Sequence, residues 1–197
     1  MNEFHPLELH EDYLQSRLGN KVLQIAFEEA RKTDPDAILI YNDNNNHYLG
    51  DSFKRKFEIV KGLKKLGLVD AVGMHMHLNK NEYHKIPSTE EFAEALQAFS
   101  ELGVEVYVTE FDVNLSNIQR EDRFLYQGQI YYDMLKTYLE EGVGDVFSMW
   151  DMYDNQSWLN DHLGKENTDP VIFDDRGNPK PSFYALLQVL YAAAFSE

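Results

Sequence analysis

The amino-acid sequence predicts an α/β protein in which helices cover a parallel β-sheet. Segments with helical and strand-like patterns alternate along the chain, and the strand-like segments are short apolar runs. Such runs are typical of parallel strands that are buried on both faces. The 197 residues, 43% of them hydrophobic, suffice for a single domain spanning residues 1–197, and the sequence contains no linker-like stretch.

The first half of the chain predicts a leading helix, two strands and the helix between them. Apolar residues recur at helical spacing between residues 13 and 32, where an Asp-Pro-Asp segment stops the pattern. The apolar run 37–41 predicts the first strand, and residues 53–63 predict the helix that follows it. A second strand is predicted over residues 69–78.

The second half continues the alternation. The segment Ser-Thr-Glu-Glu that starts at Ser88 has the form of a capping box, which predicts that a helix begins there. A third strand is predicted over 104–113, before a long helix that ends at Gly142. The run 146–150 predicts a fourth strand, and a last helix follows the prolines near residue 180. The order is one helix and then four strand–helix units, as expected when helices connect parallel strands.

Composition narrows the possible partners. The 18 basic and 34 acidic residues give a formal charge of −16, which argues against nucleic acids and anionic membrane surfaces as partners. The absence of cysteine excludes disulfides, iron–sulfur clusters and thiol catalysis. No run approaches the roughly 20 apolar residues of a membrane span, and the N-terminal residues show no signal-peptide pattern.

The third predicted strand ends in two acids, Glu110 and Asp112. Valines at positions 104, 106 and 108 share their parity, so strict alternation predicts that all five side chains face the same way. In folds built from strand–helix units, the carboxyl ends of the strands form the catalytic face. A carboxylate at that place is a candidate nucleophile or general base.

His75 and His77 close the second predicted strand in the same manner and share one face. A His-x-His pair on a strand can hold a metal ion if further ligands join it. The pair can also orient a neighbouring carboxylate by hydrogen bonding, or it can be purely structural. The residues alone leave these three interpretations open.

Aromatic side chains gather around the end of the fourth predicted strand. Trp150, Tyr153 and Trp158 lie in one segment with Asp151 and Asp154. Flat aromatic faces beside carboxylates are typical of sugar-binding sites, where rings stack on sugar C–H groups and acids accept hydrogen bonds from hydroxyls. An ordinary aromatic core is the alternative interpretation.

These strand ends resemble segments of glycoside hydrolase family 10, the endo-β-1,4-xylanases. The resemblance covers nearly the whole chain, and the similar segments occur in the family's order. They are Tyr41-Asn42-Asp43, Gly73-Met74-His75-Met76-His77-Leu78, Val108-Thr109-Glu110-Phe111-Asp112-Val113, Trp150 with Ser157-Trp158-Leu159, and Pro170-Val171-Ile172-Phe173-Asp174 with Asn178-Pro179-Lys180-Pro181.

The resemblance implies retaining hydrolysis of β-1,4-xylosidic bonds in xylan by a two-carboxylate mechanism, without a cofactor or a metal. By this resemblance Glu110 is the nucleophile and Glu3 the general acid/base. His77 and Asp112 would hold Glu110 ionised and oriented. The two carboxylates of a retaining enzyme lie about 5–5.5 Å apart.

The resemblance also implies the residues that contact sugar. Asn2 would contact a sugar 2-hydroxyl, and Trp150 and Trp158 would wall the sugar at the point of cleavage. The other substrate-binding positions that the motifs imply are Tyr41, Asn42 and His75. The implied partner is xylan or a xylo-oligosaccharide, and the implied location is extracellular.

The fold that the resemblance implies is an α/β (β/α)8 TIM barrel, which typically needs about 250 residues. The chain matches the C-terminal portion, so we expect a partial (half) barrel of about four strand–helix units plus a leading helix. It departs from the motifs where His75 replaces a glutamine, Asn44 a tyrosine and Asp151 a glycine. Because a half barrel leaves sheet edges and apolar surface uncovered, we expect a homo-oligomer or a complementing fragment to cover them.

Two alternatives to a hydrolytic half-site remain at this stage. The first is a non-catalytic xylan-binding half-barrel that keeps the aromatic residues. The second is a metal-dependent barrel hydrolase that uses His75 and His77.

Overall fold

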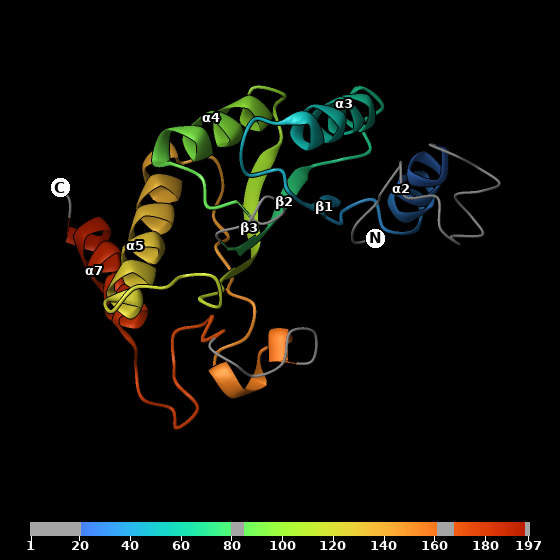
Figure 1. Ribbon diagram of the computed structural model, residues 1–197. Coiled ribbons are helices and arrows are strands. Elements are labelled where there is room, and N and C mark those ends of the chain that lie inside the picture. The colour runs from blue at the N-terminus through green and yellow to red at the C-terminus, as the bar shows by residue number, and fades with distance from the viewer. Residues whose placement is uncertain (1–20, 80–84, 161–167, 196–197) are drawn as a thin grey trace.

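A computed structural model describes residues 21–79, 85–160 and 168–195. Three parallel strands alternate with helices, and a long connection leads to the C-terminal helix (Figure 1). The elements are α2 (Lys21–Thr33), β1 (Ile40–Asn44), α3 (Asp51–Lys65), β2 (Ala71–Leu78), α4 (Thr89–Ser100), β3 (Glu105–Val113), α5 (Arg123–Glu141), the short 3₁₀ helix η1 (Asp154–Gln156) and α7 (Pro181–Phe195).

The predicted alternation is therefore present over the first three strand–helix units, with local signals where they were expected. Ser88 caps α4, and its side chain and that of Glu91 form the reciprocal capping box. Gly142 ends α5 in the left-handed conformation, which glycine adopts without a steric penalty. The predicted leading helix is described from Lys21 onward, and its earlier residues lie outside the described part of the chain.

The sheet has the order β1-β2-β3, with parallel neighbours. Its register shifts at one place, because Met74 pairs with Val108 whereas the next residue, His75, pairs with Glu110. Thr109 is therefore an extra residue in β3, and it forms a β-bulge. Bulges of this kind redirect the side chains that follow them.

The bulge corrects a prediction made from parity. Met74 and His75 are adjacent in β2 and so point to opposite sides of the sheet. Their partners Val108 and Glu110 must also point to opposite sides. The prediction that Glu110 and Asp112 share a face with the preceding valines is therefore wrong, because one inserted residue reverses the alternation between them.

One face of the sheet carries the core, and apart from Asp43 at the end of β1 its buried residues in β2 and β3 are apolar. Helices α3, α4 and α5 lie along this side (Figure 1). Phe53 of α3 packs on Phe99 of α4 with ring centroids 4.8 Å apart, and Phe111 of β3 meets Tyr131 of α5 edge to face at 4.8 Å. The sheet residues that form this face are all 0% exposed: Val72, Met74, Met76, Leu78, Val106, Val108, Phe111 and Val113.

The predicted fourth strand over residues 146–150 is not an extended strand of the sheet. Phe147 makes a single isolated bridge with Val108. The segment still follows the edge of β3, because Val108 N donates to Val146 O at 2.9 Å and Trp150 N donates to Phe111 O at 3.0 Å. Ser148 N also donates to Val108 O at 2.7 Å, so the next bond on β3 comes three residues further on, at Phe111. The bulge at Thr109 lies between these two positions and interrupts the edge against which a regular ladder would form.

The first strand also differs from its prediction. It covers Ile40–Asn44 rather than 37–41, and so includes three polar residues. Asp43 is fully buried on the helix side, where Lys56 of α3 lies 3.1 Å from Oδ1. Buried pairing of these charges lets a polar sequence continue the strand. None of the helices in the described ranges is both long and apolar enough to span a bilayer.

Candidate active site

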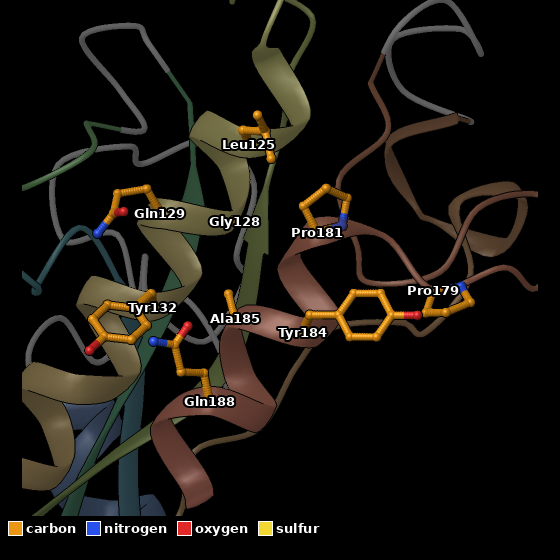
Figure 2. A pocket seen from close by; sticks show the side chains of 9 residues that line it. All are labelled: Leu125, Gly128, Gln129, Tyr132, Pro179, Pro181, Tyr184, Ala185 and Gln188. Carbon is orange, nitrogen blue, oxygen red and sulfur yellow. The ribbon is translucent and has the colours of Figure 1, made fainter. Parts of the chain in front are cut away.

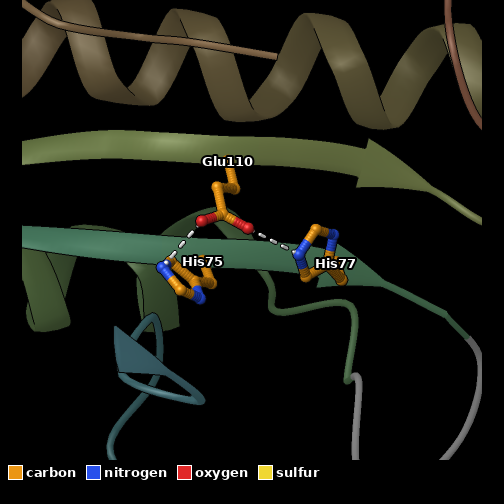
Figure 3. A group of neighbouring side chains, drawn as sticks. All are labelled: His75, His77 and Glu110. Carbon is orange, nitrogen blue, oxygen red and sulfur yellow. Dashed lines mark hydrogen bonds and ion pairs between the residues drawn. The ribbon is translucent and has the colours of Figure 1, made fainter. Parts of the chain in front are cut away.

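The polar ends of β2 and β3 meet on the face of the sheet opposite the helices. The register places His75 beside Glu110 and His77 beside Asp112. Glu110 reaches from β3 to a position between the two imidazoles of β2 (Figure 3). His75 Nε2 lies 2.9 Å from Glu110 Oε1, and His77 Nε2 lies 3.0 Å from Oε2. Each carboxylate oxygen of Glu110 thus faces its own imidazole.

His77 is the centre of a chain of contacts between two carboxylates. Its Nδ1 lies 2.7 Å from Asp112 Oδ2, on the side of the ring opposite Glu110. Burial alone lowers the pKa of His77, but hydrogen bonding to Asp112 and its charge, together with those of Glu110, outweigh burial and raise the pKa. A His77 cation donates one N–H to each carboxylate, which fixes the orientation of both.

The cluster is buried but not sealed. The side chains of His75 and Asp112 are 1% exposed, whereas those of Glu110 and His77 are 8% and 12% exposed. Solvent or a ligand therefore meets Glu110 and His77 first. The low exposure of the other two side chains protects the contacts that hold them.

Two tryptophan rings lie close to the ring of His77. The Trp158 ring lies 4.9 Å from the His77 ring, and the Trp150 ring lies 6.3 Å from it, both measured between centroids. Trp158 Nε1 donates to Asp112 Oδ2 at 3.0 Å, which joins this aromatic side chain to the same network. Trp150 is 40% exposed, so its ring is available to a ligand beside the carboxylate.

Asp151 was noted in the sequence both as an acid beside the aromatic residues and as a departure from a glycine. Its backbone φ is +71°, a left-handed conformation that glycine adopts readily and Asp tolerates. Its carboxylate accepts a hydrogen bond from Trp158 N at 3.1 Å. Asp151 therefore preserves the turn and gains a contact that positions Trp158.

The floor beneath Glu110 is formed by close contact between the three strands. Gly73 pairs with Asn42, and a Cβ on Gly73 would come within 2.0 Å of Asn42 Oδ1 and 2.9 Å of Thr109 Cγ2. Thr109 Oγ1 donates to Asn42 Oδ1 at 2.6 Å. Thr109 is the bulge residue, and no local sequence signal identified it.

The structure does not bring Tyr41 to this group. Tyr41 is 2% exposed, and its hydroxyl donates to Asp43 Oδ2 at 2.6 Å. Asp43 lies on the helix side of the sheet, as does Tyr41 by alternation along β1. Asn2 and Glu3, the predicted sugar contact and general acid/base, lie outside the described residues.

A separate cavity lies between α5 and α7 and has a volume of about 560 Å³. Tyr132, Tyr184 and two glutamines line it, as Figure 2 shows. No carboxylate or imidazole faces this cavity, so it lacks groups for proton transfer or nucleophilic attack. Among the described residues, a possible metal-ligand set of three or more side chains occurs at His75, His77 and Glu110.

Comparison with known proteins gives a consistent result. Residues 2–189 match the family model described as glycosyl hydrolase family 10. A β-1,4-xylanase of Dictyoglomus thermophilum is 32% identical over 187 residues, which cover 86% of this chain and 50% of the relative. Endo-1,4-β-xylanase B of Thermotoga neapolitana is 29% identical, over 88% of this chain and 49% of the relative. The chain thus spans about half the length of these curated relatives.

Solved structures agree with the sequence relatives. Native xylanase 10B from Thermotoga maritima superimposes with a TM-score of 0.80 and 27% identity, covering 90% of this chain and 54% of that one. A xylanase from Thermoanaerobacterium saccharolyticum in complex with xylotetraose gives a TM-score of 0.77 and 26% identity, over 87% and 51% of the two chains. The fold is thus a partial (β/α)-barrel of the xylanase type, and the chain belongs to glycosyl hydrolase family 10.

Proposed function

We propose that this chain carries the nucleophile side of a retaining β-1,4-xylanase site. One observation carries the proposal: the carboxylate of Glu110 is contacted at both oxygens by imidazoles at the carboxyl ends of two parallel strands. A nucleophile needs this kind of fixed orientation, because its attack is effective only in a narrow geometry. Membership of a family whose relatives are named xylanases supports the choice of xylan as substrate.

In this mechanism a carboxylate oxygen of Glu110 forms a bond to the anomeric carbon while the glycosidic C–O bond breaks. The leaving sugar takes a proton from Glu3, the proposed general acid. Water then attacks the same carbon with its proton passing to Glu3, and Glu110 is released as a carboxylate. His77 and Asp112 keep Glu110 aligned through both steps, and His75 contacts its other oxygen.

The aromatic residues have a separate role in the proposal. Trp150 and Trp158 flank the opening at which Glu110 and His77 are exposed. Their rings offer faces for stacking against a xylose unit, while Asn42 lies in the floor below. Tyr41 acts on substrate only indirectly here, by fixing Asp43 and hence the course of β1.

An activated covalent inhibitor tests the nucleophile without requiring the general acid. In 2,4-dinitrophenyl 2-deoxy-2-fluoro-β-xylobioside, the leaving group departs without protonation and the fluorine slows hydrolysis of the glycosyl-enzyme. We expect the purified chain to gain one fluoroxylobiosyl group, located by peptide mass spectrometry on Glu110. The Glu110→Gln variant should remain unlabelled.

The matched control is Glu105→Gln, which changes an exposed acid at the opposite end of the same strand. Labelling should be unaffected by it. Absence of labelling in the unchanged chain, or labelling that persists in Glu110→Gln, would overturn the proposal. If the chain is labelled but releases no reducing sugar from xylan, Glu110 acts as a nucleophile and the general acid is the group that does not function.

We further propose that copies of this chain associate through surface that a whole barrel would cover. Helix α7 exposes large apolar side chains, at 58% for Tyr184, 63% for Tyr191 and 78% for Phe195. Exposed apolar surface of this kind favours association. Sedimentation velocity should show a dimer or larger species at micromolar concentration, and Tyr191→Lys should shift it toward monomer. A stable, well-folded monomer over the whole concentration range would contradict this expectation.

A further inference from the structure

The contacts around Glu110 have a second chemical meaning. Two imidazole nitrogens and one carboxylate converge there, and all three ligand atoms lie within 4.8 Å of one another. In a tetrahedral zinc site with bonds of about 2.0–2.1 Å, neighbouring ligand atoms lie roughly 3.3 Å apart. The longest separation must therefore shorten by at most about 1.5 Å, a shift on the scale of a side-chain movement.

We propose that His75, His77 and Glu110 form a binding site for a divalent transition-metal ion such as Zn²⁺. The ion would replace the direct contacts of Glu110 with both imidazoles by three coordinate bonds. Imidazole and carboxylate ligands together suit zinc, nickel and copper, whereas magnesium and calcium prefer sites made of oxygen ligands alone.

The surroundings of the three ligands support this assignment. Asp112 Oδ2 lies 2.7 Å from His77 Nδ1, which directs Nε2 of the same ring toward Glu110. A carboxylate behind a metal-bound histidine is a common arrangement, because it fixes the ring and strengthens the ligand. Trp158 in turn donates to Asp112 and holds that carboxylate in place.

Charge and access point the same way. Glu110 and Asp112 are both buried, and a divalent ion would balance their two negative charges when the imidazoles are neutral. Glu110 and His77 are the two members of the cluster through which an ion enters, since their side chains are 8% and 12% exposed. Water or a ligand from that side would complete the coordination.

A bound ion and a glycosyl group compete for the same carboxylate. The metal site therefore makes zinc an inhibitor of the nucleophile, and this consequence rests on the proposed function. Binding itself does not, because the three ligands hold the ion whether or not Glu110 attacks a sugar. The His75→Gln variant best separates metal binding from the role of Glu110 as nucleophile, because glutamine keeps a hydrogen-bond donor beside Glu110 but offers no imidazole ligand.

Equilibrium dialysis with chelator-buffered Zn²⁺ tests binding directly on the untagged chain. We expect one zinc ion per chain at saturation, and a drop in affinity of more than about tenfold in both His75→Gln and Glu110→Gln. Addition of Co²⁺ should give the visible absorption bands of a low-coordinate nitrogen–oxygen site, and Mg²⁺ should not compete. The matched control is His47→Gln, because His47 is another buried histidine, outside the cluster, and it should bind zinc as the unchanged chain does.

Circular dichroism identifies any variant that does not fold, and the other cluster variant then carries the test. The proposal is overturned if the unchanged chain binds no zinc at stoichiometric level, or if both folded cluster variants bind as tightly as the unchanged chain. Covalent labelling supplies the separate test of inhibition. Zinc should slow labelling of the unchanged chain, and a chelator should restore it, whereas absence of labelling without zinc would refute the proposed function and leave the binding result standing.

Discussion

Two clusters of buried charge can be compared in this protein, and they differ in what satisfies them. In the long connection before α7, Lys180 Nζ donates to both oxygens of Asp154 at 3.0 and 2.9 Å. Backbone groups complete this pair, since Asp169 O accepts from Lys180 at 2.8 Å and Val171 N donates to Asp154 Oδ1 at 3.0 Å. Burial raises the pKa of Asp154 and lowers that of Lys180, despite their mutual attraction.

At the ends of β2 and β3, by contrast, the charges meet only through side chains. Glu110 is contacted by two imidazoles, and Asp112 by an imidazole and an indole. Within the described residues, the contacts of both carboxylates are with side chains and not with the backbone of a neighbouring segment. The first cluster therefore links separate segments of the chain and stabilises the fold. The second orients the carboxylate of Glu110, which can still bind a ligand in place of an imidazole.

The comparison separates stability from activity. When a buried charge is bonded to the backbone of another segment, removal of its partner should lower the free energy of unfolding. When a buried charge is bonded only to other side chains, removal of a partner should disturb its orientation, and so lower the reaction rate more than the stability. The three changes below test this difference, beginning with the largest expected effect.

Removal of the cation from the first cluster should have the largest effect. Lys180→Met leaves Asp154 buried without its counter-charge, and we expect a loss of about 3–5 kcal/mol in the free energy of unfolding. Urea denaturation followed by circular dichroism measures it. The control is Lys61→Met, which removes the cation of an exposed pair with Glu58 and should change stability by less than about 0.5 kcal/mol. If Lys180→Met lowers the free energy of unfolding as little as the control does, the two clusters do not differ in their contribution to stability.

The second cluster should respond in rate rather than in stability. Asp112→Asn weakens the contact that orients His77, and through it Glu110. We expect the rate of covalent labelling by the fluoroxylobioside to fall about 10–100-fold. The urea midpoint should shift much less than in Lys180→Met. If Asp112→Asn lowers the urea midpoint as much as Lys180→Met does, the second cluster also serves mainly to stabilise the fold, and the comparison fails.

The same two regions show how far sequence reasoning reached. Glu110, Asp112, His75 and His77 could be placed together, because polar residues at the ends of neighbouring parallel strands must meet at one edge of the sheet. The orientation of the two acids was derived from strict alternation along the strand. That prediction was wrong, because no local sequence pattern indicates that Thr109 is an extra residue in β3. The site prediction was nevertheless useful, since the bulge turned both acids together.

The first cluster shows the opposite limit. Asp154 and Lys180 are 26 residues apart and belong to no periodic element, so only tertiary structure brings them together. The sequence placed Asp154 in a segment that could bind sugar or form an aromatic core, and the structure shows that its carboxylate is occupied by Lys180 and Val171 N. The prediction of a fourth strand was wrong for a related reason. Its residues have strand propensity, but a regular ladder also needs an uninterrupted edge, and the bulge in β3 removes it.

A third, more exposed pair extends the comparison to the surface and should give the smallest effect. Asp70 Oδ2 accepts from Leu39 N at 2.7 Å and from Arg31 at 2.5 Å, which joins the end of α2 to the start of β1. Burial alone raises the pKa of Asp70, but these backbone and guanidinium donors outweigh it and lower the pKa. Because the folded state holds the carboxylate ionised, its stabilisation is present above the unfolded pKa of about 3.9 and is lost as pH falls further, through the folded pKa.

The side chain of Asp70 is 41% exposed, so solvent screening limits this contribution to less than about 1 kcal/mol. Asp70→Asn should therefore lower stability slightly at pH 7, and the difference from the unchanged chain should narrow as pH falls below about 4. Urea titrations of both proteins between pH 7 and pH 3 measure that difference. A gap that stays constant over the whole range would mean that the Asp70 side chain acts through shape and neutral hydrogen bonding. Charge would then matter to the fold only where it is buried, as it is between Lys180 and Asp154.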